Sequence, residues 1–194
     1  MKQRLELIKR YLKVTRAYEI ARRLFVMNAF DGVLTIMGVV MGAHLSGVAN
    51  PNIVITAGIG GSVAMGISGM SGAYMAERAE RMRDLKKLEL AMLTHLDETH
   101  VARASRVATI IIALVDGISP ALCASVLILP YLLVPAISMD MAFYTSIVSG
   151  LGVLFLLGTF LAKISEENLI RAGMQMVAVG LVTIVVVSFL IGSG

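Results

Sequence analysis

The chain has 194 residues, of which 57% are hydrophobic and only 15% charged, and its mean hydropathy is +0.84. This composition excludes an ordinary soluble globular protein and is typical of a helical membrane bundle. The formal net charge of +4 comes from basic residues beside apolar stretches, so we read it as a topology signal and expect no nucleic-acid partner. The single Cys123 excludes a disulfide framework and a cysteine metal cluster.

The first 23 residues are basic and place Leu5, Ile8 and Leu12 among Lys and Arg at roughly helical spacing. This pattern is typical of an amphipathic helix lying on an anionic inner leaflet. A plain basic flank that fixes topology explains it equally well. No cleavage-type sequence ends the apolar stretch that follows, so we interpret that stretch as a membrane span and not as a signal peptide.

Five apolar stretches follow one another, each long enough to cross a hydrocarbon core of roughly 30 Å as a helix. They are continuous and not alternating, which rejects a membrane barrel. The sequence therefore predicts an all-α membrane protein with five transmembrane helices. The predicted spans cover residues 24–48, 53–76, 107–133, 141–162 and 172–191.

The 17 Lys and Arg residues fall in three places: eight before the first span, seven between spans two and three, and two between spans four and five. Because basic residues stay on the cytoplasmic side, the N-terminus is predicted in the cytosol and the C-terminus outside. The organisation that follows is a basic segment, a first pair of spans, a charged cytosolic helical segment and three further spans. Their boundaries are 1–23, 24–76, 77–106 and 107–194.

The first two spans resemble the third and fourth. Asp31-Gly32 corresponds to Asp116-Gly117, and the sequence GAYMA at 72–76 corresponds, with an offset of one residue, to GTFLA at 158–162. Such a pattern predicts a parallel two-helix repeat with a fifth helix added, as in many transporters. A coincidence between Gly-rich membrane helices is the open alternative.

Asp31 and Asp116 are the acidic residues that lie well inside spans. Counted from Arg23 and Arg106 at a helical rise of 1.5 Å per residue, they lie roughly 12 to 15 Å from the cytosolic end. A carboxylate there costs at least about 2.5 kcal/mol, so it is a functional-site hypothesis by default. No span contains Lys or Arg, so a bound cation or a proton must neutralise these acids. The alternative is a protonated Asp that hydrogen-bonds between helices.

Sulfur-containing side chains accompany Asp31. Met41 follows it on a helical stripe that also contains Met27 and Thr35, and the second span contributes Met65 and Met70. Thioethers beside a carboxylate suit Fe²⁺ or Mn²⁺ better than Ca²⁺ or Mg²⁺. Packing is the alternative role for each Met taken singly.

The second span repeats small residues every three or four positions, a pattern that predicts close helix packing within the bundle or across a dimer. These small residues are Gly58, Gly61, Ser62, Gly66, Gly69, Gly72 and Ala76.

In the third span, Pro120 follows Asp116 by four residues. A proline at this position would free the Asp116 carbonyl to bind an ion, or would simply kink the helix.

Glu77, Glu80 and Asp84 share one helix face in the segment between spans two and three. They are predicted to collect divalent metal at the mouth of the path. A solvated helix with internal ion pairs, such as Glu77 with Arg81, is the alternative. No phosphate loop, nucleophile elbow or zincin helix is present, so the sequence gives no support for an enzyme.

The run DGVLTIMGVVMGA at 31–43 resembles the first span of the vacuolar iron transporter family, and TAGIGG at 56–61 and SGAY at 71–74 are similar to its second span. The resemblance implies a homodimeric transporter with five helices per chain that moves Fe²⁺, often also Mn²⁺, out of the cytosol in exchange for protons, with no cofactor. It assigns the metal-site aspartate to Asp31. The chain looks like a short or divergent prokaryotic-type member.

Several positions depart from the family pattern. A ligand methionine of the second span falls on Gly69, where only Met70 or Met65 is at hand to substitute, and acids of that span fall on Gly61 and Ala73. Another acid, near the start of span one, falls on Leu24, and Asp116 is an acid that the family pattern does not include. These departures leave the fold expectation intact and leave the metal and the coupling ion open.

Two other functions remain as alternatives. In a membrane scaffold or assembly subunit, Asp31 and Asp116 would be protonated and would pack helices together. In a proton-coupled carrier, they would bind a small organic cation. With no long targeting extension, a prokaryotic plasma membrane is the expected location.

Overall fold

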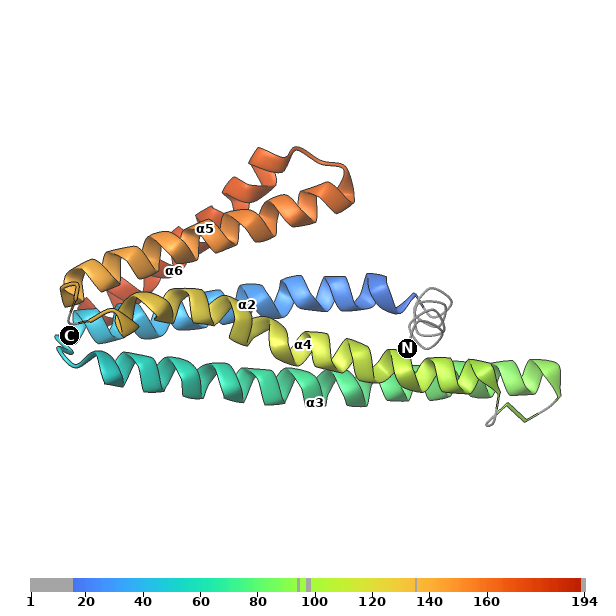
Figure 1. Cartoon of the computed structure of the whole chain (residues 1–194). Helices are drawn as coiled ribbons and strands as arrows, with labels where there is room; N and C mark the ends of the chain where they lie inside the picture. Colours follow the sequence, from blue (N-terminus) through green and yellow to red (C-terminus); the bar gives the residue numbers. More distant parts are fainter. Residues whose placement is uncertain (1–15, 94, 97–98, 135, 193–194) are drawn as a thin grey trace. The chain divides into compact units, whose positions relative to one another are not determined.

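The computed structural model describes residues 16–93, 95–96, 99–134 and 136–192, and across these ranges the regular structure is helical (Figure 1). This confirms the all-α fold predicted from the sequence. The helices are α2 (Ala17–Leu45), α3 (Pro51–Met92), α4 (His100–Leu132), α5 (Met139–Ser165) and α6 (Leu169–Gly192).

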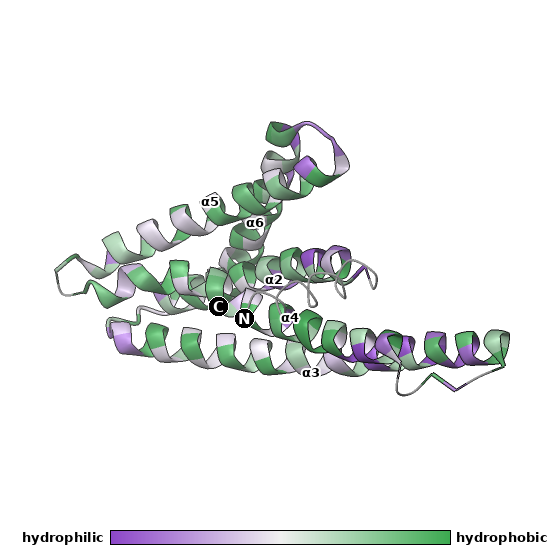
Figure 2. Cartoon of the chain, turned by 45° about the vertical axis from the view of Figure 1, so that its right-hand side comes forward, coloured by the Kyte–Doolittle hydropathy of each residue, from purple (hydrophilic) through white to green (hydrophobic). Residues whose placement is uncertain are grey.

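Each of the five helices is long and apolar enough to cross a membrane. The most apolar 18-residue windows have mean hydropathies between 1.6 in α3 and 2.5 in α6. Figure 2 shows the distribution, with α5 and α6 largely hydrophobic and hydrophilic residues gathered on the C-terminal part of α3 and the first turns of α4. The prediction of five membrane-spanning helices is confirmed.

All five helices begin before the predicted spans, and α3, α5 and α6 also end after them, whereas α2 and α4 end at Leu45 and Leu132, short of the predicted 48 and 133. Residues 77–92 continue α3 without a break, and residues 100–106 form the first turns of α4, so the charged segment is built from the ends of two long helices. Residues 17–23 likewise form the start of α2. The rest of the predicted basic amphipathic helix, residues 1–15, lies outside the described residues.

Local sequence explains where several helices begin and end. Ser138 is extended, and its hydroxyl accepts a hydrogen bond from the Met141 N–H, which caps α5. α5 ends at Glu166, whose φ of 58° is the left-handed conformation usual at this position. Asn168 then caps α6, because its Oδ1 accepts hydrogen bonds from the N–H groups of Ile170 and Arg171.

The chain divides into two compact units, which comprise residues 1–25 with 67–118, and residues 26–66 with 119–194. We call these unit 1 and unit 2. The described part of unit 1 has a small core in which Ala17 and Ala21 of α2 meet Ala108 and Ile112 of α4. The core of unit 2 is larger: its buried residues come from α2, α3, α4 and α5, and half-buried side chains of α6 pack against it. It includes Val33, Ile36, Met37, Val54, Leu127, Ile128, Tyr131, Phe143 and Leu154.

In unit 2, α5 and α6 form a hairpin whose backbones touch. A Cβ atom built on Gly158 would lie 2.5 Å from the carbonyl oxygen of Ala172, which is closer than real Cβ contacts allow. A Cβ on Gly173 would likewise lie 2.5 Å from the ring of Phe155. Small residues at such contacts let membrane helices approach closely, and dispersion forces then hold them together.

Candidate functional site

Asp31 lies on α2 within unit 2, immediately before Gly32, where that helix comes close to α4. A Cβ on Gly32 would lie 2.7 Å from the Cα of Pro120, so only glycine fits between the two backbones. Successive helical residues point about 100° apart. Gly32 therefore faces α4, whereas the side chain of Asp31 is turned away and is exposed on the surface of the chain.

An exposed stripe on α2 surrounds this carboxylate. Met27 is 56% exposed, Thr35 is exposed, and a Cβ on Gly38 would meet nothing within 4 Å. With Asp31, these residues occupy positions i−4, i+4 and i+7 of one helix face. A thioether, a hydroxyl and a carboxylate thus share one open surface in the middle of an apolar helix.

Met41 does not share this surface. It is 5% exposed and packs in the hydrophobic core of unit 2. Ten helical residues from Asp31 correspond to about 1000°, which places Met41 roughly 80° away from the carboxylate around the helix. Met27 is therefore the methionine that accompanies Asp31, and the role of Met41 as a metal ligand remains a prediction.

One seam of α3 packs against its own chain, while a neighbouring face stays open. Val54, Gly58, Ser62 and Gly66 are buried at intervals of four residues, and a Cβ on Gly58 would lie 2.8 Å from the side chain of Ile128. By contrast, a Cβ on Gly61 would meet nothing within 4 Å. The small residues of the second span thus form two faces, of which only one is used inside the chain.

The two methionines predicted on the second span differ in exposure. Met65 is half-buried, and Met70 is 36% exposed. They lie in different units, Met65 in unit 2 and Met70 in unit 1. Met70 contributes to an apolar groove between α3 and α4. The sequence suggests Met65 or Met70 as a substitute for the ligand methionine that the family resemblance places at position 69, and this stays a prediction.

Asp116 lies on α4 in unit 1 and is only 3% exposed. Its carboxylate lies against Gly69 of α3: a Cβ built there would lie 3.1 Å from Asp116 Oδ2 and 3.6 Å from the Asp116 carbonyl oxygen. Gly69 is the position at which the family resemblance places a ligand methionine. In this chain it lies next to Asp116, an acid that the family pattern does not include. Glycine at 69 leaves room for that carboxylate.

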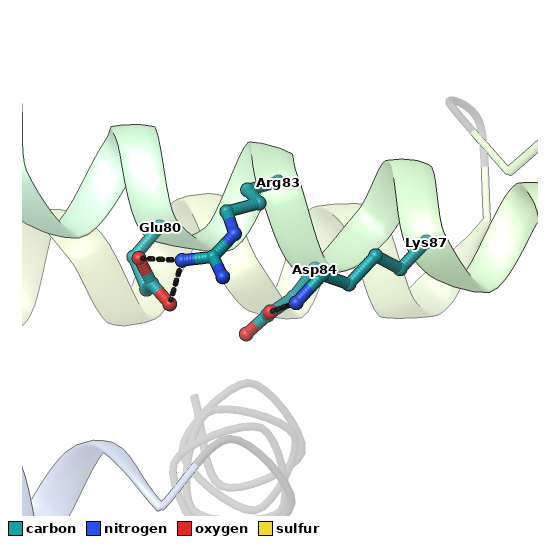
Figure 3. Close-up of polar contacts among 4 residues, drawn as sticks. All are labelled: Glu80, Arg83, Asp84 and Lys87. Atoms are coloured by element: carbon teal, nitrogen blue, oxygen red, sulfur yellow. Dashed lines mark hydrogen bonds and ion pairs between the residues drawn. The ribbon is translucent and has the colours of Figure 1, made fainter.

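The three acids predicted to collect metal each pair with a basic residue of their own helix. Arg81 Nε donates to Glu77 Oε2 at 3.0 Å, Arg83 pairs with Glu80 at 3.3 Å, and Lys87 lies 4.0 Å from Asp84. Figure 3 shows the second and third pairs side by side along α3. These contacts are what the ion-pair alternative predicts, and the metal-collecting role is still a prediction.

Among the described residues, no group of three or more His, Cys, Asp or Glu side chains is arranged to hold a metal ion. Any complete coordination shell built from the described part of the chain must therefore use other donors, such as Met, hydroxyls and carbonyls, or a second copy of the chain. Asp31 has an exposed carboxylate, and its role as a metal ligand stays a prediction.

Sequence reasoning missed a polar cluster at the other end of α2. The ring of His44 stacks on Phe143 with centroids 3.8 Å apart, and His44 Nδ1 lies 3.9 Å from Asp140 Oδ1. Both segments lie in unit 2 beside short connections between helices. The sequence does contain a signal for this cluster: His44 lies alone near the end of the first span, and Asp140 lies at the start of the fourth.

These features define the class of protein: a multi-pass helical membrane protein with carboxylates inside its spans. A model of the VIT family matches residues 22–90 and 79–193 of the chain. A relative, an uncharacterized protein of Methanocaldococcus jannaschii, is 35% identical over 176 residues, which is 89% of each chain. The chain therefore belongs to the VIT family, the vacuolar iron transporters. This membership indicates a membrane metal-ion transporter, which is a transporter class and not an enzyme class.

Proposed function

We propose that this protein exports Fe²⁺, and also Mn²⁺, from the cytosol in exchange for protons, and that Asp31 is the central carboxylate of the transport site. The observation that supports this most directly is the exposed stripe of Met27, Asp31 and Thr35 in the middle of an apolar helix. A borderline divalent metal accepts thioether and oxygen ligands together. The same carboxylate binds a proton when the metal leaves, because metal and proton compete for its oxygens.

A homodimer completes this site in our proposal. The chain leaves the carboxylate of Asp31 exposed, and at least about 2.5 kcal/mol opposes leaving such a group in lipid. A twofold axis beside α2 would bring two Asp31 side chains together. Two carboxylates balance one divalent ion, and after its release they balance two protons. The exchange of one metal ion for two protons therefore leaves the site neutral in both states.

The open small-residue face of α3 supports such a dimer. Ala57, Gly60 and Ala64 are exposed, and a Cβ on Gly60 or Gly61 would meet nothing within 4 Å of its own chain. Small residues on an exposed membrane helix permit close contact with another helix. We assign this face, together with the stripe around Asp31, to the interface between two copies.

In this proposal Asp116 is a second carboxylate on the path, and Glu77, Glu80 and Asp84 concentrate metal near its cytosolic entrance. These acids would exchange a basic partner for the metal ion. The exposed ion pairs of Glu80 and Asp84 are suited to this, because such pairs contribute only about 0.2–1 kcal/mol each, whereas the pair of Glu77 with Arg81 is largely buried. The proposed location is a prokaryotic plasma membrane with the N-terminus in the cytosol.

Transport in proteoliposomes tests the proposal. We expect an imposed pH gradient to drive Fe²⁺ and Mn²⁺ flux through the wild-type protein, and Asp31→Asn to abolish it while the protein stays folded. Asp140→Asn is the matched control, because it removes the same charge from an exposed residue at the start of α5. If the wild type is folded and dimeric but carries no metal, the scaffold function gains support. Competition by organic cations, with no response to metal, would favour the organic-cation carrier.

A further inference from the structure

Unit 1 contains a cavity of about 400 Å³ between the charged half of α3 and the first turns of α4. Three arginines line it, two from α3 and one from α4, together with hydroxyl groups from both helices. The polar lining consists of Tyr74, Arg78, Arg81, Ser105, Arg106 and Thr109. No residue of the exposed stripe around Asp31 lines this cavity, and that stripe belongs to unit 2.

Arg81 is the most deeply placed of these arginines. Its side chain is only 12% exposed, and its Nε donates to Glu77 Oε2 at 3.0 Å. Its Nη2 is buried and has no hydrogen-bond partner among the residues that the structure describes. A buried donor left without an acceptor costs about 1–3 kcal/mol, and more when it is charged. An acceptor inside the cavity would remove this cost.

The charge around the cavity favours an anion as that acceptor. Its lining residues include three arginines and no acid, and Glu77 pairs with one of these arginines, Arg81, so positive charge is in excess. Arginine binds phosphate through two parallel N–H donors, in a geometry that lysine does not offer. The cavity is therefore suited to a phosphate group.

The position of the cavity along the helices indicates where this phosphate comes from. Arg78 and Arg81 follow the apolar stretch that ends at Ala76, and Arg106 precedes the one that begins at Val107. Tyr74 stands at the same boundary, a position typical of tyrosines at the membrane interface. The arginines thus lie at the level of lipid headgroups, where basic pockets between helices bind anionic lipids.

An apolar groove adjoins the cavity. It has a volume of about 290 Å³, shares Tyr74 and Ile110 with the cavity, and continues along Met70, Ala113 and Leu114 toward the apolar halves of the helices. A free phosphate ion would use only the arginine cavity. A phospholipid would use both, with its phosphate in the cavity and an acyl chain along the groove.

We propose that unit 1 binds an anionic phospholipid, with the phosphate held by Arg78, Arg81 and Arg106 and one acyl chain in the groove beside Met70 and Leu114. This site has a different ligand from the metal-transport proposal, and the two proposals meet only at the ion pair of Arg81 with Glu77.

Native mass spectrometry of the delipidated full chain tests this site with dioleoyl phosphatidylglycerol and dioleoyl phosphatidylcholine as probes. We expect the anionic lipid to bind at least about tenfold more tightly, a difference of about 1.4 kcal/mol. Arg78→Gln with Arg106→Gln should remove most of this preference, and both side chains are exposed, so folding should survive. The matched control is Arg83→Gln with Arg103→Gln, exposed arginines on the same two helices outside the cavity, which should retain the preference.

Two further arms distinguish a lipid from a small anion. Ser71→Trp would fill the groove, so it should weaken the binding of dioleoyl phosphatidylglycerol but not that of dihexanoyl phosphatidylglycerol. Ser68→Trp lies outside the groove and should change the binding of neither lipid. Inorganic phosphate at millimolar concentration should not displace the long-chain lipid. If inorganic phosphate does displace the lipid, the cavity binds small anions and the lipid proposal is wrong. Equal binding of the two lipids by the wild type, or equal loss in the arginine control, would overturn the proposal.

Discussion

At the scale of single residues, the surroundings of Asp31 and Asp116 differ although the sequence treats them alike. Both follow an apolar run and precede a glycine, yet Asp31 is exposed on α2 whereas Asp116 is buried against Gly69. An exposed intramembrane acid is open to a partner outside its own chain, whereas a buried one is already enclosed by protein. The two aspartates are therefore expected to respond differently to substitution.

Gly69 offers a test of Asp116. A methyl group at this position would press on Asp116 Oδ2 at 3.1 Å, so the carboxylate must move by a few tenths of an ångström. Binding residues must be held to within about 0.5 Å of their productive positions, so a shift of this size uses up much of that tolerance. If Asp116 lies on the path, Gly69→Ala should slow metal flux severalfold and Asp116→Asn should slow it at least as much, while both proteins stay folded.

Gly72→Ala is the control for that experiment, because a Cβ there meets nothing within 4 Å. Flux should be measured beside thermal unfolding of each variant in detergent. Wild-type flux in Asp116→Asn, combined with a lower unfolding temperature, would assign Asp116 a packing role instead.

The sequence predicted the functional interest of the two intramembrane aspartates, because charge inside an apolar run is visible without a structure. It did not predict that Met41 would be buried, since a stripe traced ten residues along a helix drifts away from its starting face. The burial of Arg81 was also invisible, because it depends on a cavity formed with a second helix. Long-range packing carries this information, and local pattern does not.

At the scale of elements, the short connection between α5 and α6 determines how the hairpin closes. Three residues join the helices, and the first of them, Glu166, has a φ of 58°. Its N–H and that of Glu167 both donate to the carbonyl of Ala162, which ends α5. A left-handed conformation is unfavourable for a residue with a side chain and is favourable for glycine.

Glu166→Gly should therefore stabilise the protein by about 0.5–1 kcal/mol, observed as a higher thermal unfolding temperature in detergent. Glu167→Gly removes the same charge from a position without positive φ and should not stabilise. Equal gains in the two variants would mean that lost charge, and not backbone conformation, is responsible.

The sequence predicted all five helices but placed several ends too early. Apolar runs mark the part of a helix inside the membrane, and they carry no signal for a helix that continues into water. α3 extends from Ala76 to Met92 through charged residues that pair along the helix, as Arg83 does with Glu80. Such pairs stabilise an exposed helix and leave its hydropathy low.

At the scale of the whole molecule, the dimer is the feature on which the proposed function depends. A Cβ atom on Gly61 would meet nothing within 4 Å in its own chain, so in the proposed dimer the main effect of a larger side chain is expected at the second copy. Gly61→Leu is expected to shift the purified protein from dimer to monomer and to reduce metal flux, measured by light scattering in detergent and by transport in liposomes.

Gly152→Leu is the matched control, because Gly152 is equally open but lies on α5. It should leave both the dimer and the flux unchanged. A dimer that survives Gly61→Leu must associate through a different face, and the proposed pairing of two Asp31 side chains would then be wrong.

The backbone contact between Gly158 and Ala172 has a consequence for how the chain is made. Helices that touch so closely and are joined by three residues can enter the bilayer together, as a preformed hairpin. The orientation of α6 is then set when α5 inserts, and Lys163 and Arg171 at the joined ends act as a single topological signal. Charges added near Gly192 should accordingly either leave both helices in place or invert both, but they should not turn α6 alone.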